Sequence, residues 1–209
     1  MGVMGERTQL ELKGIPCNEL EINPPTTKSI VCSRSFGRPV SSLNDVLESI
    51  SLFTSKAVRN LRNKGLVAKN LTVFISTNPF KDTRQYANFI QDNLTDYSAY
   101  TPDFINLSAV LLKKIFKDDY LYKKTGVMLT DIKKQEYLYP NLFSSGYGND
   151  KKQNLMQAID SINDKFGNDK VFFASNGIKQ TWQMKREILT PRYTTRWDEI
   201  LTTSSAQFR

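Results

Sequence analysis

Strand-like and helix-like segments alternate in a fixed order between residues 29 and 132, and this order constrains the fold more than any other feature. The strand segments combine period-two alternation or apolar runs with β-branched residues, and the helical segments repeat apolar residues every three or four positions. The strand segments are residues 29–36, 71–77, 85–92 and 124–132, and the helical segments are residues 43–64 and 101–115. The order β-α-β-β-α-β predicts an α+β domain in which two helices cover one face of a four-stranded sheet and leave the other face open.

Start and stop signals flank both helices. Ser42 is followed three residues later by Asp45, which is typical of a helix N-terminus, and Gly65 ends the same helix. Thr101 and Pro102 together predict the start of the second helix, with Thr101 as the capping residue.

The segments on either side of this domain have a different character. A short helix is expected over residues 5–13, ended by Gly14, and residues 15–28 contain three prolines that favour an extended tether. Residues 133–152 are polar and rich in glycine near their end, as in a linker. A helix over residues 155–166 and a strand over residues 171–174 then predict a small α/β unit at the C-terminal end.

The composition excludes several kinds of chemistry. The chain has no histidine, which rules out a Ser-His-Asp triad and imidazole metal ligands. Its two cysteines, Cys17 and Cys32, are too few for a zinc site and are expected to be free thiols. No apolar run approaches the roughly 18–20 residues of a membrane span, and no secretory signal pattern is present. We therefore expect a cytoplasmic protein.

The chain is basic, with 29 Lys and Arg against 21 Asp and Glu and a net charge of +8. A polyanionic partner and simple solubility explain this charge equally well by themselves. The expected open face of the sheet favours a partner, because its strands and loops carry hydroxyl groups and cations that suit a phosphate backbone. A solvated sheet face without a partner is the alternative. The residues expected there are Thr72, Phe74, Ser76, Lys81, Arg84, Lys123 and Lys124.

Aromatic and basic residues alternate near the C-terminal end, a pattern that suits base stacking or packing on a partner. The opposing interpretation is a small subdomain with tryptophan in its core. We favour the core for Trp182 and leave Trp197 open.

Several segments together resemble the C-terminal part of the UmuC-type polymerases, the Y-family translesion subunits of bacterial DNA polymerase V. The resemblance covers nearly the whole chain, and its last segment is long and specific. The segments that carry it are residues 3–17, 28–37, 71–80, 126–131 and 182–197.

The resemblance implies a division of the chain into five parts. These are the end of a thumb domain (1–14), a tether (15–28), a little finger domain (29–133), a linker (134–152) and a UmuC-type C-terminal domain (153–209). The family's catalytic carboxylates, which hold two Mg²⁺ ions, lie in a palm domain that precedes the thumb. We therefore expect a piece of a longer polymerase that is inactive alone, and we assign no catalytic residue.

In this family the little finger lies along the template–primer duplex and adds grip to an open active site. The resemblance therefore implies phosphate contacts that position DNA without reading its sequence, during error-prone bypass of damage in DNA repair and the SOS response. The residues expected to make them are Ser33, Arg34, Ser35, Arg38, Lys81, Arg84, Lys123 and Lys124.

The linker contains a short apolar patch that resembles the sliding-clamp-binding peptide of bacterial polymerases. Leu142 and Phe143 would enter the clamp, although Tyr139 stands where the family usually has Gln. Alternatively, these two residues pin the linker to the little finger.

The C-terminal domain of UmuC-type proteins is associated with the UmuD′ dimer and with RecA. The candidate contact residues are Arg192, Tyr193, Arg196 and Trp197, for a protein or a DNA partner. The other class of function is an interaction module that recruits or regulates a polymerase without binding DNA itself.

Overall fold

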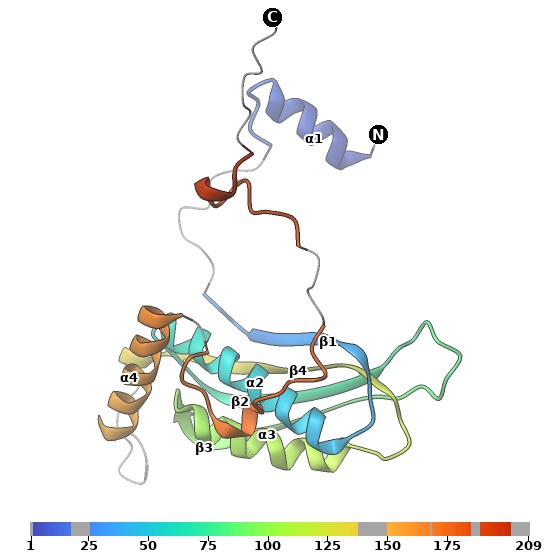
Figure 1. Ribbon diagram of the computed structural model, residues 1–209. Helices are drawn as coiled ribbons and strands as arrows, with labels where there is room; N and C mark the ends of the chain where they lie inside the picture. The colour runs from blue at the N-terminus through green and yellow to red at the C-terminus, as the bar shows by residue number, and fades with distance from the viewer. Residues whose placement is uncertain (1, 18–25, 138–149, 168, 185–188, 202–209) are drawn as a thin grey trace, which may run out of the picture.

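The computed structural model describes residues 2–17, 26–137, 150–167, 169–184 and 189–201. Four strands and four α-helices make up the main elements of these ranges (Figure 1). In chain order they are α1 (Val3–Leu12), β1 (Ile30–Val40), α2 (Leu43–Asn63), β2 (Leu66–Thr77), β3 (Ala87–Ser98), α3 (Thr101–Ile115), β4 (Tyr122–Lys134) and α4 (Asp150–Phe166).

The four strands form one antiparallel sheet in the order β1-β4-β2-β3. The β-α-β-β-α-β order predicted from the sequence is confirmed, and α2 and α3 pack side by side on one face of the sheet. Between the helices and the sheet lies a core of aliphatic and aromatic side chains. Its largest fully buried members are Tyr122, Phe36, Phe53, Phe104, Ile50, Leu61, Leu71, Ile75, Leu111, Leu112 and Leu129.

The element boundaries follow the sequence signals closely, with some differences. Ser42 is the N-cap of α2, and Gly65 and Gly14 follow their helices with φ of 64° and 80°, in the left-handed region that favours glycine. The N-cap of α3 is Tyr100 and not Thr101, whose hydroxyl accepts a hydrogen bond from Arg62. The strands extend several residues beyond the predicted ranges, since paired neighbours continue the ladders past the apolar stretches.

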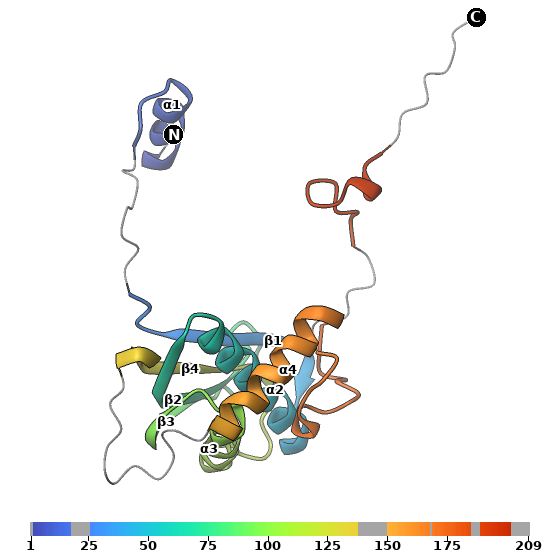
Figure 2. The same cartoon turned by 90° about the vertical axis from the view of Figure 1, so that its left-hand side faces the viewer.

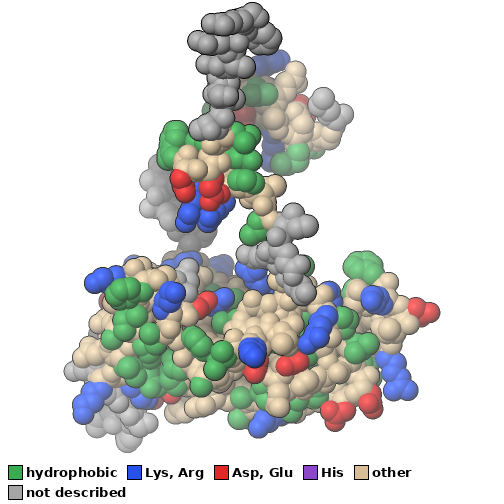
Figure 3. Space-filling model, in the orientation of Figure 1, with side chains coloured by type: hydrophobic (Ala, Val, Ile, Leu, Met, Phe, Trp, Pro, Cys, Tyr) green, Lys and Arg blue, Asp and Glu red, His purple; other side chains and the backbone are tan. Residues whose placement is uncertain are grey.

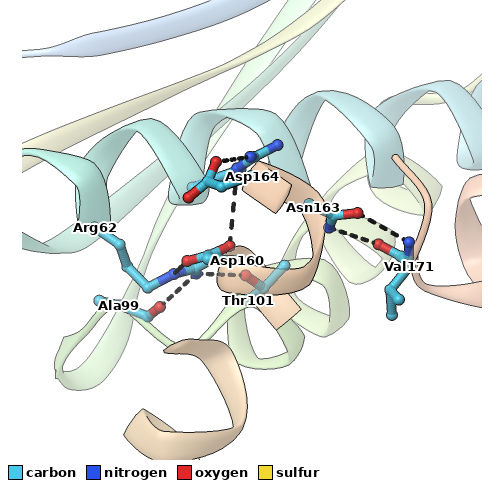
Figure 4. A network of polar contacts seen from close by, with 8 residues as sticks. Arg62, Ala99, Thr101, Asp160, Asn163, Asp164 and Val171 are labelled. Carbon is cyan, nitrogen blue, oxygen red and sulfur yellow. Dashed lines mark hydrogen bonds and ion pairs between the residues drawn. The ribbon is translucent and has the colours of Figure 1, made fainter. Parts of the chain in front are cut away.

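Helix α4 lies beside α2 and is held there by ion pairs (Figure 2). The Arg62 guanidinium donates two hydrogen bonds to the Asp160 carboxylate, with N–O distances of 2.7 and 2.9 Å. It also donates to the carbonyl of Ala99 and the hydroxyl of Thr101, so that α2, α3 and α4 meet at one side chain (Figure 4). Asp164, one turn further along α4, pairs with Arg59 at 2.6 Å.

The strand predicted over residues 171–174 is wrong. Both backbone groups of Val171 bond to the side chain of Asn163 on α4, with N–O distances of 2.9 Å, and this amide takes the place of a neighbouring strand (Figure 4). A short 3-10 helix over Ala174–Asn176 follows. Its Asn176 side chain accepts a hydrogen bond from Ser51 of α2, which fixes this segment against the helical layer.

Trp182 is buried, as favoured from the sequence, but it lies in the core formed by the sheet and α2, and not in a core of its own. Its backbone carbonyl accepts a hydrogen bond from Gly37 of β1. A Cβ atom at residue 37 would lie 2.6 Å from the Gln183 carbonyl oxygen, so glycine permits this close approach. The five-part division of the chain stays a prediction.

Helix α1 and the segment around residues 190–200 stand away from this body (Figures 1 and 2). In α1 no side chain is buried, and Trp197 is 91% exposed. Within the described ranges, no helix has the length and apolar character required to cross a bilayer.

Candidate nucleic-acid interface

The register of the sheet sorts each strand residue onto one of its two faces. Val73 and Ile75 of β2 and Val127 and Leu129 of β4 are buried beneath the helices. Because side chains alternate along a strand and antiparallel partners share a face, the intervening residues and their partners lie on the open face. These are Val31, Ser33, Ser35, Asn70, Thr72, Phe74, Ser76, Ala87, Phe89, Gln91, Asn93, Lys124, Gly126, Met128 and Thr130.

Hydroxyl and amide side chains dominate the open face, with an apolar strip among them. Among the paired positions assigned to it above, none is Asp or Glu, and the single charged residue is Lys124. Lys124 is exposed and pairs with Ser35 on one side and Ser76 on the other. The face is therefore a mostly uncharged, hydrogen-bonding surface with one cation, near the start of β4, and not the strongly cationic surface expected.

An aromatic ring lies across the middle of this face. A Cβ atom at Gly126 would stand 2.5 Å from the Phe74 ring and 2.3 Å from the Cβ of Ser33. Glycine at this position therefore lets the Phe74 ring cover the β4 backbone, which shields a residue that has no side chain of its own. Phe89, the β3 partner of Phe74, is 72% exposed beside it.

The other expected cations lie outside the paired positions of the open face. Lys81 and Arg84 are exposed in the loop between β2 and β3, and Arg38 is exposed near the end of β1. Arg34 pairs with Thr125, which places it on the helix-covered side of the edge strand, where it is exposed. Lys123 is partly buried, and its ammonium donates a hydrogen bond to the Phe36 carbonyl.

The expected hydroxyl residues Ser33 and Ser35 do lie on the open face, opposite Gly126 and Lys124. The sequence interpretation missed Phe89, Gln91, Asn93 and Thr130, which share it. Period-two counting from Thr72 identifies the β2 positions. It does not identify the others, because the register between strands cannot be counted along one strand.

The basic-aromatic segment near the C-terminal end forms a small turn that is held by hydrogen bonds and ion pairs among its own residues. The Arg192 guanidinium bonds to the Glu199 carboxylate at 2.6 Å, and the Arg192 backbone N–H donates to the same group. These hydrogen bonds lower the pKa of Glu199 below its usual value. Arg196 lies 3.9 Å from Glu199 and 4.0 Å from Asp198, whereas Tyr193 and Trp197 are exposed.

Two further sequence expectations concern other regions. Leu142 and Phe143 lie outside the described residues. Among the acidic residues, Asp103 is in the first turn of α3, and Asp131 in β4 accepts a hydrogen bond from Tyr97. In the described part of the chain, no three His, Cys, Asp or Glu side chains are grouped to hold a metal ion.

Cys17 and Cys32 are free, and burial raises the pKa of the Cys32 thiol.

Comparison with known family models identifies the family to which this sheet domain belongs. Residues 27–140, more than half of the chain, match the impB/mucB/samB family C-terminal domain. The chain therefore belongs to the impB/mucB/samB family. Residues 153–202 match a second family model, which is described as a domain of unknown function.

Individual relatives extend the similarity along 95% of the chain. The chain is 36% identical over 200 residues to Protein UmuC of Salmonella typhimurium, and 39% identical over 201 residues to Protein MucB of Escherichia coli. It spans 47% of the length of each. Among solved structures, a Y-family DNA polymerase chimera of Dbh and Dpo4 aligns with a TM-score of 0.40 and 14% identity, over 63% of this chain and 36% of the other.

Proposed function

We propose that this chain grips template–primer DNA on behalf of an error-prone translesion polymerase, with the open face of the sheet against the phosphate backbone. Family membership supports a polymerase-related role, and the resemblance to UmuC-type proteins supports the little finger assignment for residues 29–133. The grip would be independent of sequence, as damage bypass requires.

The observation that carries the proposal is the chemistry of the open face. It offers the Ser35 and Ser76 hydroxyls on either side of Lys124 and the Ser33 hydroxyl further along β1, with no carboxylate at its paired positions. Hydroxyl, amide and ammonium groups all donate hydrogen bonds to phosphate oxygens, whereas a carboxylate would repel them. The face therefore carries no group at its paired positions that would repel a polyanion.

The cations around the face would supply long-range attraction. Lys81, Arg84 and Arg38 are exposed, and none is paired with a carboxylate in the described ranges. Each phosphate that such a side chain neutralises releases condensed counterions, which makes the binding constant fall as salt rises. Affinity should therefore decrease steeply with salt, by about 0.9 in the log–log slope for each phosphate contact.

Binding of the 209-residue chain to labelled primer–template DNA, measured by fluorescence anisotropy across a salt titration, tests the proposal. Lys124→Ala should weaken binding and reduce the salt slope by about one. Lys113→Ala removes the same charge from an exposed position on α3, on the opposite side of the sheet, and is the matched control. It should change the slope much less.

Absence of binding at low salt, or equal effects of the two variants, would contradict the proposal. No DNA binding together with retained binding to a polymerase would favour the alternative class, an interaction module that recruits or regulates a polymerase. The catalytic step itself we assign to a palm domain elsewhere in the polymerase, whose carboxylates would hold the Mg²⁺ ions.

Two protein contacts belong to the same proposal. Leu142 and Phe143 would enter a hydrophobic cleft of the sliding clamp, and replacing both with alanine should abolish clamp pull-down.

Contact with the UmuD′ dimer or RecA would involve the turn around Arg192 and Trp197. An exposed Trp is the side chain with most to gain from burial in a partner's pocket. Arg192, already bonded to Glu199, would hold the turn in shape, leaving Tyr193, Arg196 and Trp197 for the partner.

A further inference from the structure

The loop between β2 and β3 carries the most exposed aromatic ring of the sheet domain. Phe80 is 94% exposed, on a loop in which Lys81 and Arg84 are exposed as well. In Figure 1 the loop projects beyond the end of the sheet, at the right of the view, and Figure 3 shows hydrophobic and basic side chains gathered there, with an acidic one beside them. A ring in water at such a tip contributes little to folding, since it buries almost no area.

Two side chains, Gln85 and Asn78, hold the loop in shape. The Gln85 amide nitrogen lies 3.0, 2.7 and 3.1 Å from the carbonyl oxygens of Asn78, Lys81 and Thr83, and donates hydrogen bonds to them. The Asn78 side chain accepts a hydrogen bond from the Phe80 backbone N–H at 3.1 Å. The backbone that presents Phe80 is therefore organised by bonds within the loop itself.

The base of the loop is fastened to the sheet and to α3. The Thr77 hydroxyl donates to the Gln85 side-chain oxygen at 2.8 Å and accepts from the Tyr86 N–H at 2.9 Å. The Tyr86 hydroxyl donates to the Ile115 carbonyl at the end of α3. A ligand that binds at the tip would thus meet a pre-ordered loop and would not have to pay the entropy of ordering it.

The charges beside the ring are available to a ligand. Within the described ranges, neither Lys81 nor Arg84 has a carboxylate within ion-pairing distance. Asp82 is the only acid between Thr77 and Tyr86, so this loop carries a net charge of +1. An exposed ring followed in the same loop by two exposed cations is a combination that suits single-stranded nucleic acid, because the ring can stack on a base while the cations attract the phosphates.

We propose that Phe80 stacks on an unpaired base of single-stranded DNA, with Lys81 and Arg84 contacting the flanking phosphates. The proposal rests on the DNA-binding function above and adds a second mode to it. Inside a duplex the base faces are stacked on one another and only their edges are accessible in the grooves, so an aromatic face requires an unpaired base. The open sheet face would hold the duplex, and the loop would hold the adjoining single strand.

The test compares three oligonucleotides with the full 209-residue chain: single-stranded oligo-dT, an oligomer of equal length with abasic sites, and a blunt duplex. Phe80→Ala should weaken oligo-dT binding roughly 5- to 150-fold, the range measured for loss of one base–aromatic stack. It should leave duplex binding and the weak binding of the abasic oligomer unchanged. Phe80→Trp should retain affinity, and its fluorescence should be quenched by oligo-dT but not by the abasic oligomer.

Phe166→Ala is the matched control, because Phe166 is also a largely exposed phenylalanine, 61% accessible, but lies on α4. It should bind all three oligonucleotides like the unaltered chain. Equal losses for single strand and duplex in Phe80→Ala, or equal affinity of the unaltered chain for oligo-dT and the abasic oligomer, would overturn the stacking proposal. The proposal that the sheet face binds duplex DNA is tested independently, by the effect of Lys124→Ala on the salt slope. The stacking proposal can therefore be wrong while the duplex-binding proposal is right, and the experiments distinguish the two cases.

Discussion

The indole ring of Trp182 packs edge-on against the ring of Phe53, with centroids 5.7 Å apart and planes at 77°. Phe36 makes a similar contact from the other side, at 5.8 Å. Phe36 and Phe53 lie within the segment that matches the impB/mucB/samB domain, whereas Trp182 lies within the domain of unknown function. The two matched segments therefore share one hydrophobic core, and the second helps to complete the fold of the first.

Trp182→Ala should lower the free energy of unfolding by about 3–5 kcal/mol, because it empties a site that is only 2% exposed and removes two edge-to-face ring contacts. Urea denaturation followed by circular dichroism measures the loss. Trp197→Ala is the control: this ring is 91% exposed, and its removal should change stability by less than about 0.5 kcal/mol. Equal stability of the two variants would show that residues 150–184 do not belong to the core.

Asp160 and Asp164 of α4 should differ sharply in how much they stabilise the fold. Asp160 and Arg62 are each about 15% exposed, so Asp160→Ala would leave a partly buried guanidinium without its counter-ion and should cost about 3 kcal/mol. Asp164 is 66% exposed, and Asp164→Ala should cost less than about 1 kcal/mol despite its 2.6 Å contact with Arg59. Thermal denaturation of both variants tests this order, and a larger loss for Asp164→Ala would contradict it.

Much of the sheet domain could be predicted because its local signals agree with its tertiary structure. The helix signals at Ser42 and Gly65, and the alternation along 71–77, correspond to the observed elements. The sequence offers the same kind of signal at 171–174, where it fails. Within the described ranges no strand pairs with that segment, and the Asn163 side chain bonds to the Val171 backbone instead.

The candidate site was less predictable than the fold, because a site depends on relations between strands. The positions of Thr72, Phe74 and Ser76 follow from one strand alone, whereas the positions of Phe89 and Gln91 depend on the β2–β3 register. Lys123 and Lys124 are neighbours in β4 but differ in exposure: Lys124 lies on the open face, whereas Lys123 falls at a ladder irregularity and its ammonium bonds to the Phe36 carbonyl. Composition predicts that cations are present, but not which of them are free.

Gly126→Ala should destabilise the sheet by about 1–3 kcal/mol, because the new methyl group would overlap the Phe74 ring and the Ser33 side chain. The double variant with Phe74→Ala should recover part of that loss, since it removes one of the three close contacts, the others being with the Ser33 side chain and the Cys32 carbonyl oxygen. Ser76→Ala, on the same face, is the control and should stay within about 0.5 kcal/mol of the unaltered chain. Additive losses in the double variant would show that the ring does not lie across this glycine.

The Arg192–Glu199 pair should give the C-terminal turn a pH dependence of defined sign. The Arg192 guanidinium and backbone N–H hydrogen-bond to the carboxylate and hold the pKa of Glu199 below its ordinary value. A group whose pKa is lowered by folding stabilises the folded form above its unfolded pKa. That contribution is lost as the pH falls through the lowered value. The turn should therefore be intact at neutral pH and loosen in acid.

Carbon-detected NMR of the Glu199 carboxyl group during an acid titration measures this directly. The midpoint should lie below the ordinary glutamate value of about 4.3, and Arg192→Ala should return it toward that value. Arg196→Ala is the matched control: Arg196 lies 3.9 Å from the carboxylate, whereas Arg192 bonds to it at 2.6 Å, so its removal should move the midpoint much less. An ordinary midpoint in the unaltered chain would mean that Arg192 is free to contact a partner, and would return it to the set of candidate binding residues.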